Sequence, residues 1–159
     1  MVVRNSWVIR GVKEANFVDK AAFEQVKRQG EKAVHDWIDG QLEGTSVTVV
    51  LIGEKTLARP FVQYEICQSL QRGNAVIGVH ISCVKDMRTQ QTSVRGNPHT
   101  IIGYYNDRQP VYFDAIADGI YDYAADNGYV NLGTWIEAAA KRKGKWARPL
   151  RAGSISNGR

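Results

Sequence analysis

Two residues one helical turn apart, Phe61 and Glu65, are the first place in this sequence whose residue types suggest chemistry. They lie in a segment where apolar residues recur every four positions, at Val62, Ile66 and Leu70. This spacing is typical of a helix that turns one apolar stripe toward a core. At about 100° per residue, Glu65 and Phe61 fall together on the flank of that stripe. A carboxylate can stabilise a developing positive charge, and an aromatic face can stack on a flat ring.

Taken alone, the two residues also have an ordinary structural explanation. A glutamate on the flank of a helix is in most proteins a solvated surface residue, and Phe61 would then belong to the edge of the core. Tyr64, next to Glu65, falls on the far side of the helix by the same angular count, so we do not assign it to a site. The spacing marks a candidate site and leaves both interpretations open.

Other familiar kinds of site are missing from the sequence. No Gly-x-Gly occurs, and no phosphate loop ends in Gly-Lys-Ser or Gly-Lys-Thr, so neither nucleotide-binding fingerprint applies. His35, His80 and His99 are scattered, and His80 with Cys83 supplies only two of the ligands that a metal site needs. We expect no cofactor and no metal. A Ser–His or Cys–His nucleophile stays open, although no nucleophile elbow is present. An enzyme would otherwise have to work with carboxylates and shape.

The surrounding sequence predicts alternating strands and helices. Residues 47–52 and 75–81 are apolar runs, as in strands buried on both faces of a parallel sheet. We also expect helices at 19–29, 31–43, 56–71 and 132–142, a third strand at 111–114 and a polar connection at 121–130. This alternation favours right-handed βαβ units. The predicted fold class is α/β, a three-layer sandwich around a central parallel sheet.

Composition indicates a single domain. The 159 residues, of which 43% are hydrophobic, suit one domain of roughly 100–200 residues. No apolar run approaches the roughly 20 residues of a membrane span, and the N-terminus lacks a signal-peptide layout. Two cysteines, Cys67 and Cys83, make no disulfide framework. We expect a cytoplasmic protein that does not contact a membrane.

The positive charge of the chain is confined to its end. Residues 141–159 hold seven of the 21 basic residues and no acidic one, which leaves 14 basic against 16 acidic residues elsewhere. Such a segment, rich also in Gly and Ser, is typical of a solvated tail, with phosphate contact as the alternative. No zinc-finger spacing or aromatic platform indicates nucleic acid binding, and we do not expect it. We divide the chain into a domain at 1–143 and a basic, flexible tail at 144–159.

Several segments of the sequence resemble a known family. They read VRNSW, WIDGQLEGTSVTVVLIGEKT, YEI, RGNAVIGVHI, VKD and NGYVNLGTWIEAAAK. Together they resemble the TIR-like proteins of bacterial Thoeris anti-phage defence, a prokaryotic branch of the Toll/interleukin receptor (TIR) domain family. The resemblance runs from residue 2 to about residue 143, and residues 37–56 are its most specific part. It implies a flavodoxin-like parallel sheet.

The resemblance also implies an activity and a site. Enzymatic members of the family cleave NAD at the nicotinamide–ribose bond and release an ADP-ribose-derived signal, which we expect to be cyclic, to activate a separate effector protein. The family's catalytic glutamate matches Glu65, and Phe61 stands where an aromatic residue, usually Trp, lines the pocket. Arg4 and Asn5 match a segment expected to contact phosphate or ribose, with a salt bridge across the sheet as the alternative for Arg4. NAD would be a substrate, and a homo-oligomer is a further expectation.

The chemistry of NAD suits a single carboxylate. The nicotinamide of NAD leaves as a neutral base, so the general acid that glycoside hydrolases use is unnecessary. Positive charge then develops on the ribose, where one ionised carboxylate can stabilise it. The flat nicotinamide or adenine ring could stack on an aromatic residue.

One difference from the family bears on function. Family members usually begin with a strand that precedes the VRNSW element, and this sequence starts at Met1 without it. In the strand order 2-1-3-4-5 that strand is interior, so we expect exposed strand edges and an incomplete pocket wall. The difference favours a second class of function, a TIR-like interaction or nucleotide-binding module without catalysis. Glu65 together with Phe61 favours the enzyme.

Overall fold

A parallel sheet forms the centre of the molecule. The computed structural model describes residues 6–9, 15–16, 20–82, 94–142 and 150–152, with side chains described in 24–82 and 94–142. The parallel strands are β3 (Val47–Ile52), β4 (Ala75–His80) and β7 (Gly119–Asp122). The parallel pairing of β3 with β4 confirms the predicted core of the sheet.

Two short strands extend this sheet beyond β3. β1 (Ser6–Ile9) pairs antiparallel with β3, and β2 (Ala15–Asn16) pairs antiparallel with β1. The strand order is β2-β1-β3-β4-β7. Our expectation of an exposed edge beside the 47–52 strand is therefore wrong. The backbone of β1 pairs with that edge, as the N–H and C=O groups of a buried strand require.

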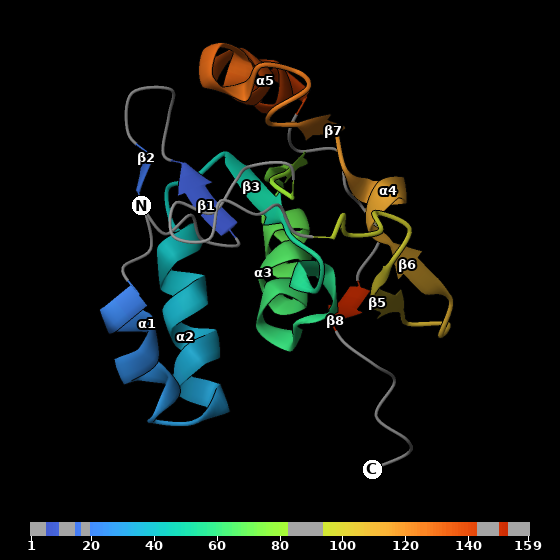
Figure 1. Cartoon of the computed structure of the whole chain (residues 1–159). Coiled ribbons are helices and arrows are strands. Elements are labelled where there is room, and N and C mark those ends of the chain that lie inside the picture. Colours follow the sequence, from blue (N-terminus) through green and yellow to red (C-terminus); the bar gives the residue numbers. More distant parts are fainter. Residues whose placement is uncertain (1–5, 10–14, 17–19, 83–93, 143–149, 153–159) are drawn as a thin grey trace.

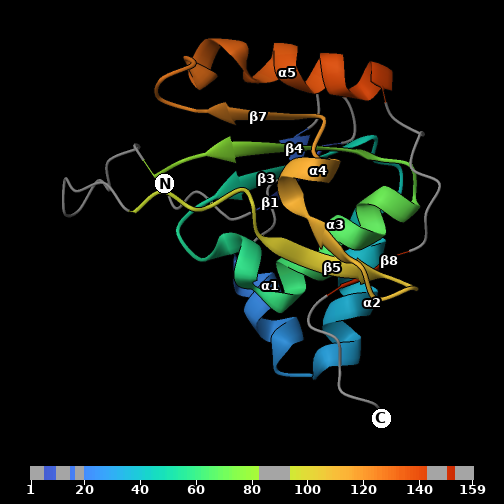
Figure 2. The same cartoon turned by 90° about the vertical axis from the view of Figure 1, so that its right-hand side faces the viewer.

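Helices cover both faces of the sheet. On one face, α5 (Gly128–Arg142) packs Ile136 and Ala139 against the odd-numbered residues of β3 and β4. On the other face, α3 (Pro60–Gln71) packs its apolar stripe against Val50, Ile52 and Val76. Figure 2 shows α5, the strands and α3 as successive layers. Alternate residues of a strand point to opposite faces, so the continuous apolar runs supply both cores. The three-layer α/β class is confirmed.

Two further helices lie beside α3 (Figure 1). α1 (Lys20–Lys27) contacts α2 (Glu31–Leu42), and α2 in turn contacts α3. The buried stripe of α2 consists of Val34, Ile38 and Leu42. Both helices agree with the elements predicted at 19–29 and 31–43.

The predicted helix at 56–71 is divided. A 3-10 turn, η1 (Thr56–Ala58), comes first, and α3 begins at Pro60. Proline suits the first turn of a helix because its missing N–H would have no helical partner there. On the opposite face, α5 begins at Gly128, earlier than the predicted 132.

A second sheet lies next to α3 with the order β6-β5-β8. Its strands are β5 (Ile101–Tyr105), β6 (Pro110–Tyr112) and β8 (Leu150–Ala152). β6 confirms the first half of the strand predicted at 111–114, and the predicted end of that strand is wrong. β6 belongs to this smaller sheet, and the chain turns into α4 (Phe113–Ile116) at Phe113. The ring of Phe113 is fully buried in the core under the central sheet, which explains why the strand ends there.

The strands β5, β7 and β8 were not predicted from the sequence. β7 is only half-buried along most of its length, so it lacks the apolar run that marks β3 and β4. β5 is half-buried in the same way. β8 falls inside the segment predicted to be a flexible tail, and its antiparallel pairing with β5 corrects that prediction for Leu150–Ala152. The other residues of 144–159 lie outside the described part of the chain.

Candidate functional site

Glu65 lies in the second turn of α3 and is only 7% exposed. A solvated surface role for this residue is therefore wrong. Burying a carboxylate is costly unless polar groups or a ligand compensate for the lost water. The burial of Glu65 is thus a feature that packing of the apolar stripe alone would not produce.

Polar contacts fix α3 to its neighbours. The side-chain amide of Gln63 donates to the carbonyl oxygens of Leu57 at 2.9 Å and Ile101 at 3.3 Å. The thiol of Cys67 donates to the carbonyl oxygen of Ile102 at 3.7 Å. Burial raises the pKa of the Cys67 thiol to about 12, so the thiol stays protonated at neutral pH and serves structure. These contacts hold α3 against η1 and β5.

A chain of buried hydroxyls connects α3 to the central sheet. The Ser69 hydroxyl donates to the backbone carbonyl of Glu65 at 2.7 Å, and the Thr48 and Ser69 oxygens are 2.7 Å apart. A serine hydroxyl has one hydrogen to give. Since Ser69 uses it on Glu65, Thr48 must be the donor in the other bond. Both hydroxyl residues are fully buried, so this relay holds the turn that carries Glu65 against β3.

Phe61 lies on the side of α3 that faces α2. Its half-buried ring meets His35 edge-on, with ring centroids 6.3 Å apart and planes at 80°. Tyr64 stacks on the same imidazole at 3.8 Å and donates its hydroxyl to Asp39 at 3.0 Å. Burial, aided by Asp39, raises the pKa of Tyr64 to about 12. Tyr64 thus lies on the same side as Phe61, contrary to our angular prediction, and both pack against α2.

A second set of polar side chains, apart from those on α3, lies at the carboxyl edge of the parallel strands. Open α/β sheets bind their ligands at this edge. Ile52, His80 and Asp122, the last residues of β3, β4 and β7, are level with one another there. Asp122 accepts hydrogen bonds from the backbone N–H groups after β7 and from Arg95, at 2.6 Å. The backbone donors, with Arg95, hold the pKa of Asp122 below its usual range.

His80 and Ser82 differ from these paired groups. His80 Nδ1 and Ser82 Oγ are buried without a hydrogen-bond partner, and each residue is 1% exposed. Burial, and then the charge of Arg95, lower the pKa of His80, against an opposing effect of Asp122. Sequence reasoning considered His80 only as half of a metal pair. Its place at the end of the apolar run AVIGVHI, at the ligand edge of a parallel strand, was the missed signal.

Comparison with known proteins decides the family. Residues 2–86 match the model of the family described as Thoeris protein ThsB, TIR-like domain. The chain is also 32% identical, over 171 residues, to a protein of Bacillus cereus (strain MSX-D12) named "Putative cyclic ADP-D-ribose synthase ThsB1". That alignment covers 85% of this chain and 89% of the relative. The chain belongs to the ThsB TIR-like family. The resemblance found in the sequence is confirmed.

For a ThsB TIR-like protein, the described residues hold only part of the predicted site. Glu65 and Phe61 occupy consecutive turns of α3, inside the matched region. Arg4 and Asn5 lie outside the described residues, as does Cys83. The roles of Glu65, Phe61, Arg4 and Asn5 stay predictions.

Two other features are absent from the described residues. They contain no group of three or more His, Cys, Asp or Glu side chains that could hold a metal ion. No helix in the ranges that the structure describes is long and apolar enough to cross a membrane.

Proposed function

We propose that this chain is an enzyme that cleaves NAD at the nicotinamide–ribose bond and makes a cyclic, ADP-ribose-derived signal nucleotide. The observation that carries the proposal is the burial of Glu65, which is 7% exposed on α3 within the region that matches the family. The relative's printed name, a cyclic ADP-D-ribose synthase, supports the product class. The nucleotide would then diffuse to a separate effector protein.

In the proposed reaction, the C–N bond between ribose and nicotinamide breaks, and its electron pair goes to the nicotinamide nitrogen. The nicotinamide is already cationic, so it leaves as a neutral base and no proton donor is needed. Positive charge develops on the ribose carbon and ring oxygen. The Glu65 carboxylate, held in a site shielded from water, stabilises that charge. A nucleophilic atom of the same ADP-ribose then donates an electron pair to the ribose carbon and closes the cyclic product, and the proton released from the attacking group passes to water.

The other predicted residues would bind the substrate. Phe61 would stack on a flat ring of NAD, worth about 0.5–1.5 kcal/mol beyond burial. Its half-buried ring already packs against α2, so Phe61→Ala should weaken both substrate binding and the helix contact. Phe61→Trp, which restores the residue usual in the family, should retain activity. Arg4 and Asn5 would contact the diphosphate or ribose, and the proposed chemistry needs no metal.

Nicotinamide release by Glu65→Gln tests the proposal. The substitution is nearly isosteric, so the fold should persist, while the loss of charge should lower the release rate about 10²–10³-fold. Glu137→Gln is the matched control, because Glu137 is exposed on α5, on the opposite face of the sheet. It should retain parental release, and circular dichroism should show both variants folded.

Two results would contradict the proposal. Parental turnover by folded Glu65→Gln would show that this carboxylate is not the catalyst. A parental protein that binds NAD but never releases nicotinamide, with or without lysate from phage-infected cells, would instead fit the alternative of a TIR-like binding module.

A further inference from the structure

Residues 94–97, which we call the strap, cross the carboxyl edge of the parallel sheet. At one end, Gly96 is buried against the end of β3. A Cβ atom added to Gly96 would collide with the carbonyl oxygen of Gly53 and lie 2.9 Å from a methyl group of Ile52. From the adjacent position, Arg95 reaches Asp122 at the end of β7, with an Nη1–Oδ2 distance of 2.6 Å. Because β4 lies between β3 and β7, the strap spans the end of β4 through the side chain of Arg95.

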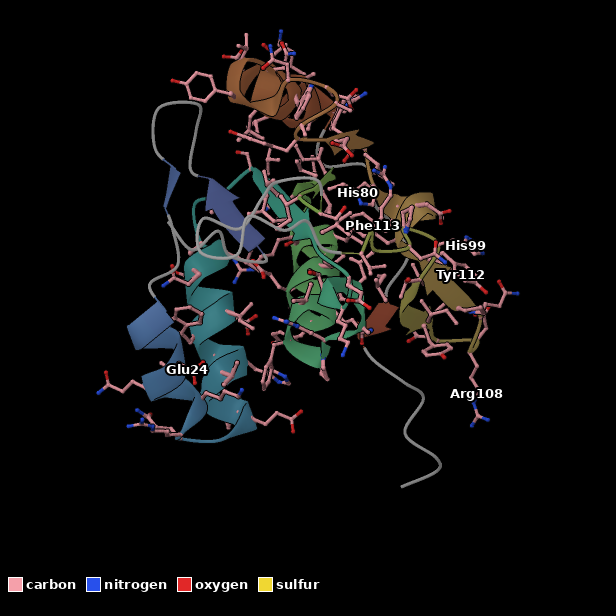
Figure 3. All side chains as sticks on the ribbon, in the orientation of Figure 1. Glu24, His80, His99, Arg108, Tyr112 and Phe113 are labelled. Carbon is pink, nitrogen blue, oxygen red and sulfur yellow. The ribbon has the colours of Figure 1, made fainter. Side chains whose placement is uncertain are left out.

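His80 and Ser82 lie at that end of β4. His80 is on the same face of the sheet as Val76, which lies four residues earlier in the same strand. Val76 packs in the core under α3. Phe113, labelled with His80 in Figure 3, belongs to that core. Arg95 acts electrostatically on His80, which agrees with its passage over the end of the strand.

The polar groups at this edge are unevenly satisfied. Asp122 accepts three hydrogen bonds with its side chain. His80 Nδ1 and Ser82 Oγ have no partner. A buried polar atom left unpaired is destabilising and therefore rare in native structures. Two such atoms lie two residues apart at the ligand edge of a parallel sheet. They indicate that a ligand supplies the missing hydrogen-bond partners.

We propose that His80 and Ser82 form a binding subsite for an uncharged polar group of the substrate, and that the strap closes over this subsite. The inference rests on the proposed function for the identity of the substrate. The charge at the edge argues for an uncharged group, since the single cation of the strap, Arg95, is already neutralised by Asp122.

The chemistry of the two atoms narrows the ligand further. A hydroxyl can donate and accept, and a neutral imidazole nitrogen does one or the other according to its tautomer. The pKa of His80 is lowered by its burial, which favours the neutral ring. A group that both donates and accepts would satisfy both atoms. NAD offers two such groups, the carboxamide of nicotinamide and the hydroxyl pairs of its riboses.

Ser82→Ala tests the subsite, with Thr134→Ala as control because Thr134 is exposed on α5. Each folded protein is titrated with NAD, nicotinamide and ADP-ribose, and its unfolding temperature is measured without ligand. Ser82→Ala should unfold at the parental temperature or above it, since it removes an unpaired polar atom. It should bind NAD about 2–10-fold more weakly, the range of one neutral hydrogen bond. If nicotinamide also binds Ser82→Ala more weakly by the same factor, the subsite holds the carboxamide of NAD. If ADP-ribose does so instead, the subsite holds ribose hydroxyls.

Gly96→Ala tests the strap separately. It leaves His80 and Ser82 in place but forces the strap away from the carbonyl oxygen of Gly53, so NAD binding should weaken as well. If Gly96→Ala binds NAD as tightly as the parent, the strap does not close over the subsite.

Unchanged NAD binding by Ser82→Ala, while the parent binds and cleaves NAD, would overturn the subsite and leave the proposed function intact. A parent that binds none of the three ligands would overturn both.

Discussion

The hydroxyl relay from Thr48 through Ser69 to the backbone carbonyl of Glu65 makes a prediction whose sign can be worked out from the structure. Ser69→Ala removes the acceptor of the Thr48 hydroxyl, which is fully buried. A buried hydroxyl donor without an acceptor costs about 1–3 kcal/mol. Ser69→Ala also loses the hydrogen bond to the Glu65 carbonyl. We expect this single variant to be clearly destabilised.

Thr48→Val should be milder. Valine keeps the shape of threonine and removes the hydroxyl that donates, so no donor is left unpaired, and the loss should be about 0.5–1.5 kcal/mol. The two effects should not add. Once Ser69→Ala has removed the acceptor, Thr48→Val eliminates the stranded hydroxyl and should recover about 1 kcal/mol. For a domain of this size, that corresponds to roughly 2–4 °C in the midpoint of thermal unfolding.

Urea unfolding of the parent, the two single variants and the double variant measures this coupling as a double-mutant cycle. The expected result is a double variant more stable than Ser69→Ala alone. If Thr48→Val costs as much stability in the Ser69→Ala background as in the parent, the two hydroxyls are independent and the relay is refuted. Nicotinamide release by the same proteins would show whether a looser α3 also lowers the activity assigned to Glu65.

Three further predictions follow from other parts of the fold. Because the pKa of His80 is depressed in the folded protein, the stability of the fold is fully present above the unfolded pKa of 6.5 and falls as the pH drops below 6.5. Urea unfolding across this pH range should show that loss for the parent and not for His80→Gln. The same dependence of stability on pH in both proteins would contradict the prediction. Arg108 has a φ of 67° in the β5–β6 turn, so Arg108→Gly should raise stability by about 0.5–1 kcal/mol, the strain relieved minus the added chain entropy; a lower thermal midpoint would be contrary. Removing residues 150–159 deletes β8, which pairs with β5 and contacts α3, so thermal stability and nicotinamide release should both fall. Removing residues 153–159 keeps β8 and should leave both nearly unchanged. Equal results for the two truncations would show that β8 contributes to neither.

The elements that the sequence predicts best are those with an unambiguous local pattern. β3 and β4 are buried along their whole length, so their apolar runs could be read directly. β7 and β8 are held mainly by their partner strands, and such pairing leaves little trace in local residue order. The position of Glu65 on the edge of the apolar stripe was also evident. Its burial depends on neighbours distant in sequence, which periodicity does not reveal, and the same is true of the strap over His80.

The two faces of the parallel sheet differ in a way that locates function on one of them. Toward α5, β3 and β4 present only aliphatic side chains (Val47, Val49, Leu51, Ala75, Ile77 and Val79). The alternate residues on the α3 side include Thr48 and His80 among apolar neighbours, and α3 adds Gln63, Glu65 and Ser69 to the buried set. Burying polar groups costs stability unless they are paired or bind something. An apolar face suffices for packing, as the α5 side shows. The polar groups on the α3 side, some serving to anchor α3 and one of them, His80, with an unpaired ring nitrogen, are therefore best explained by a site that this face holds in place.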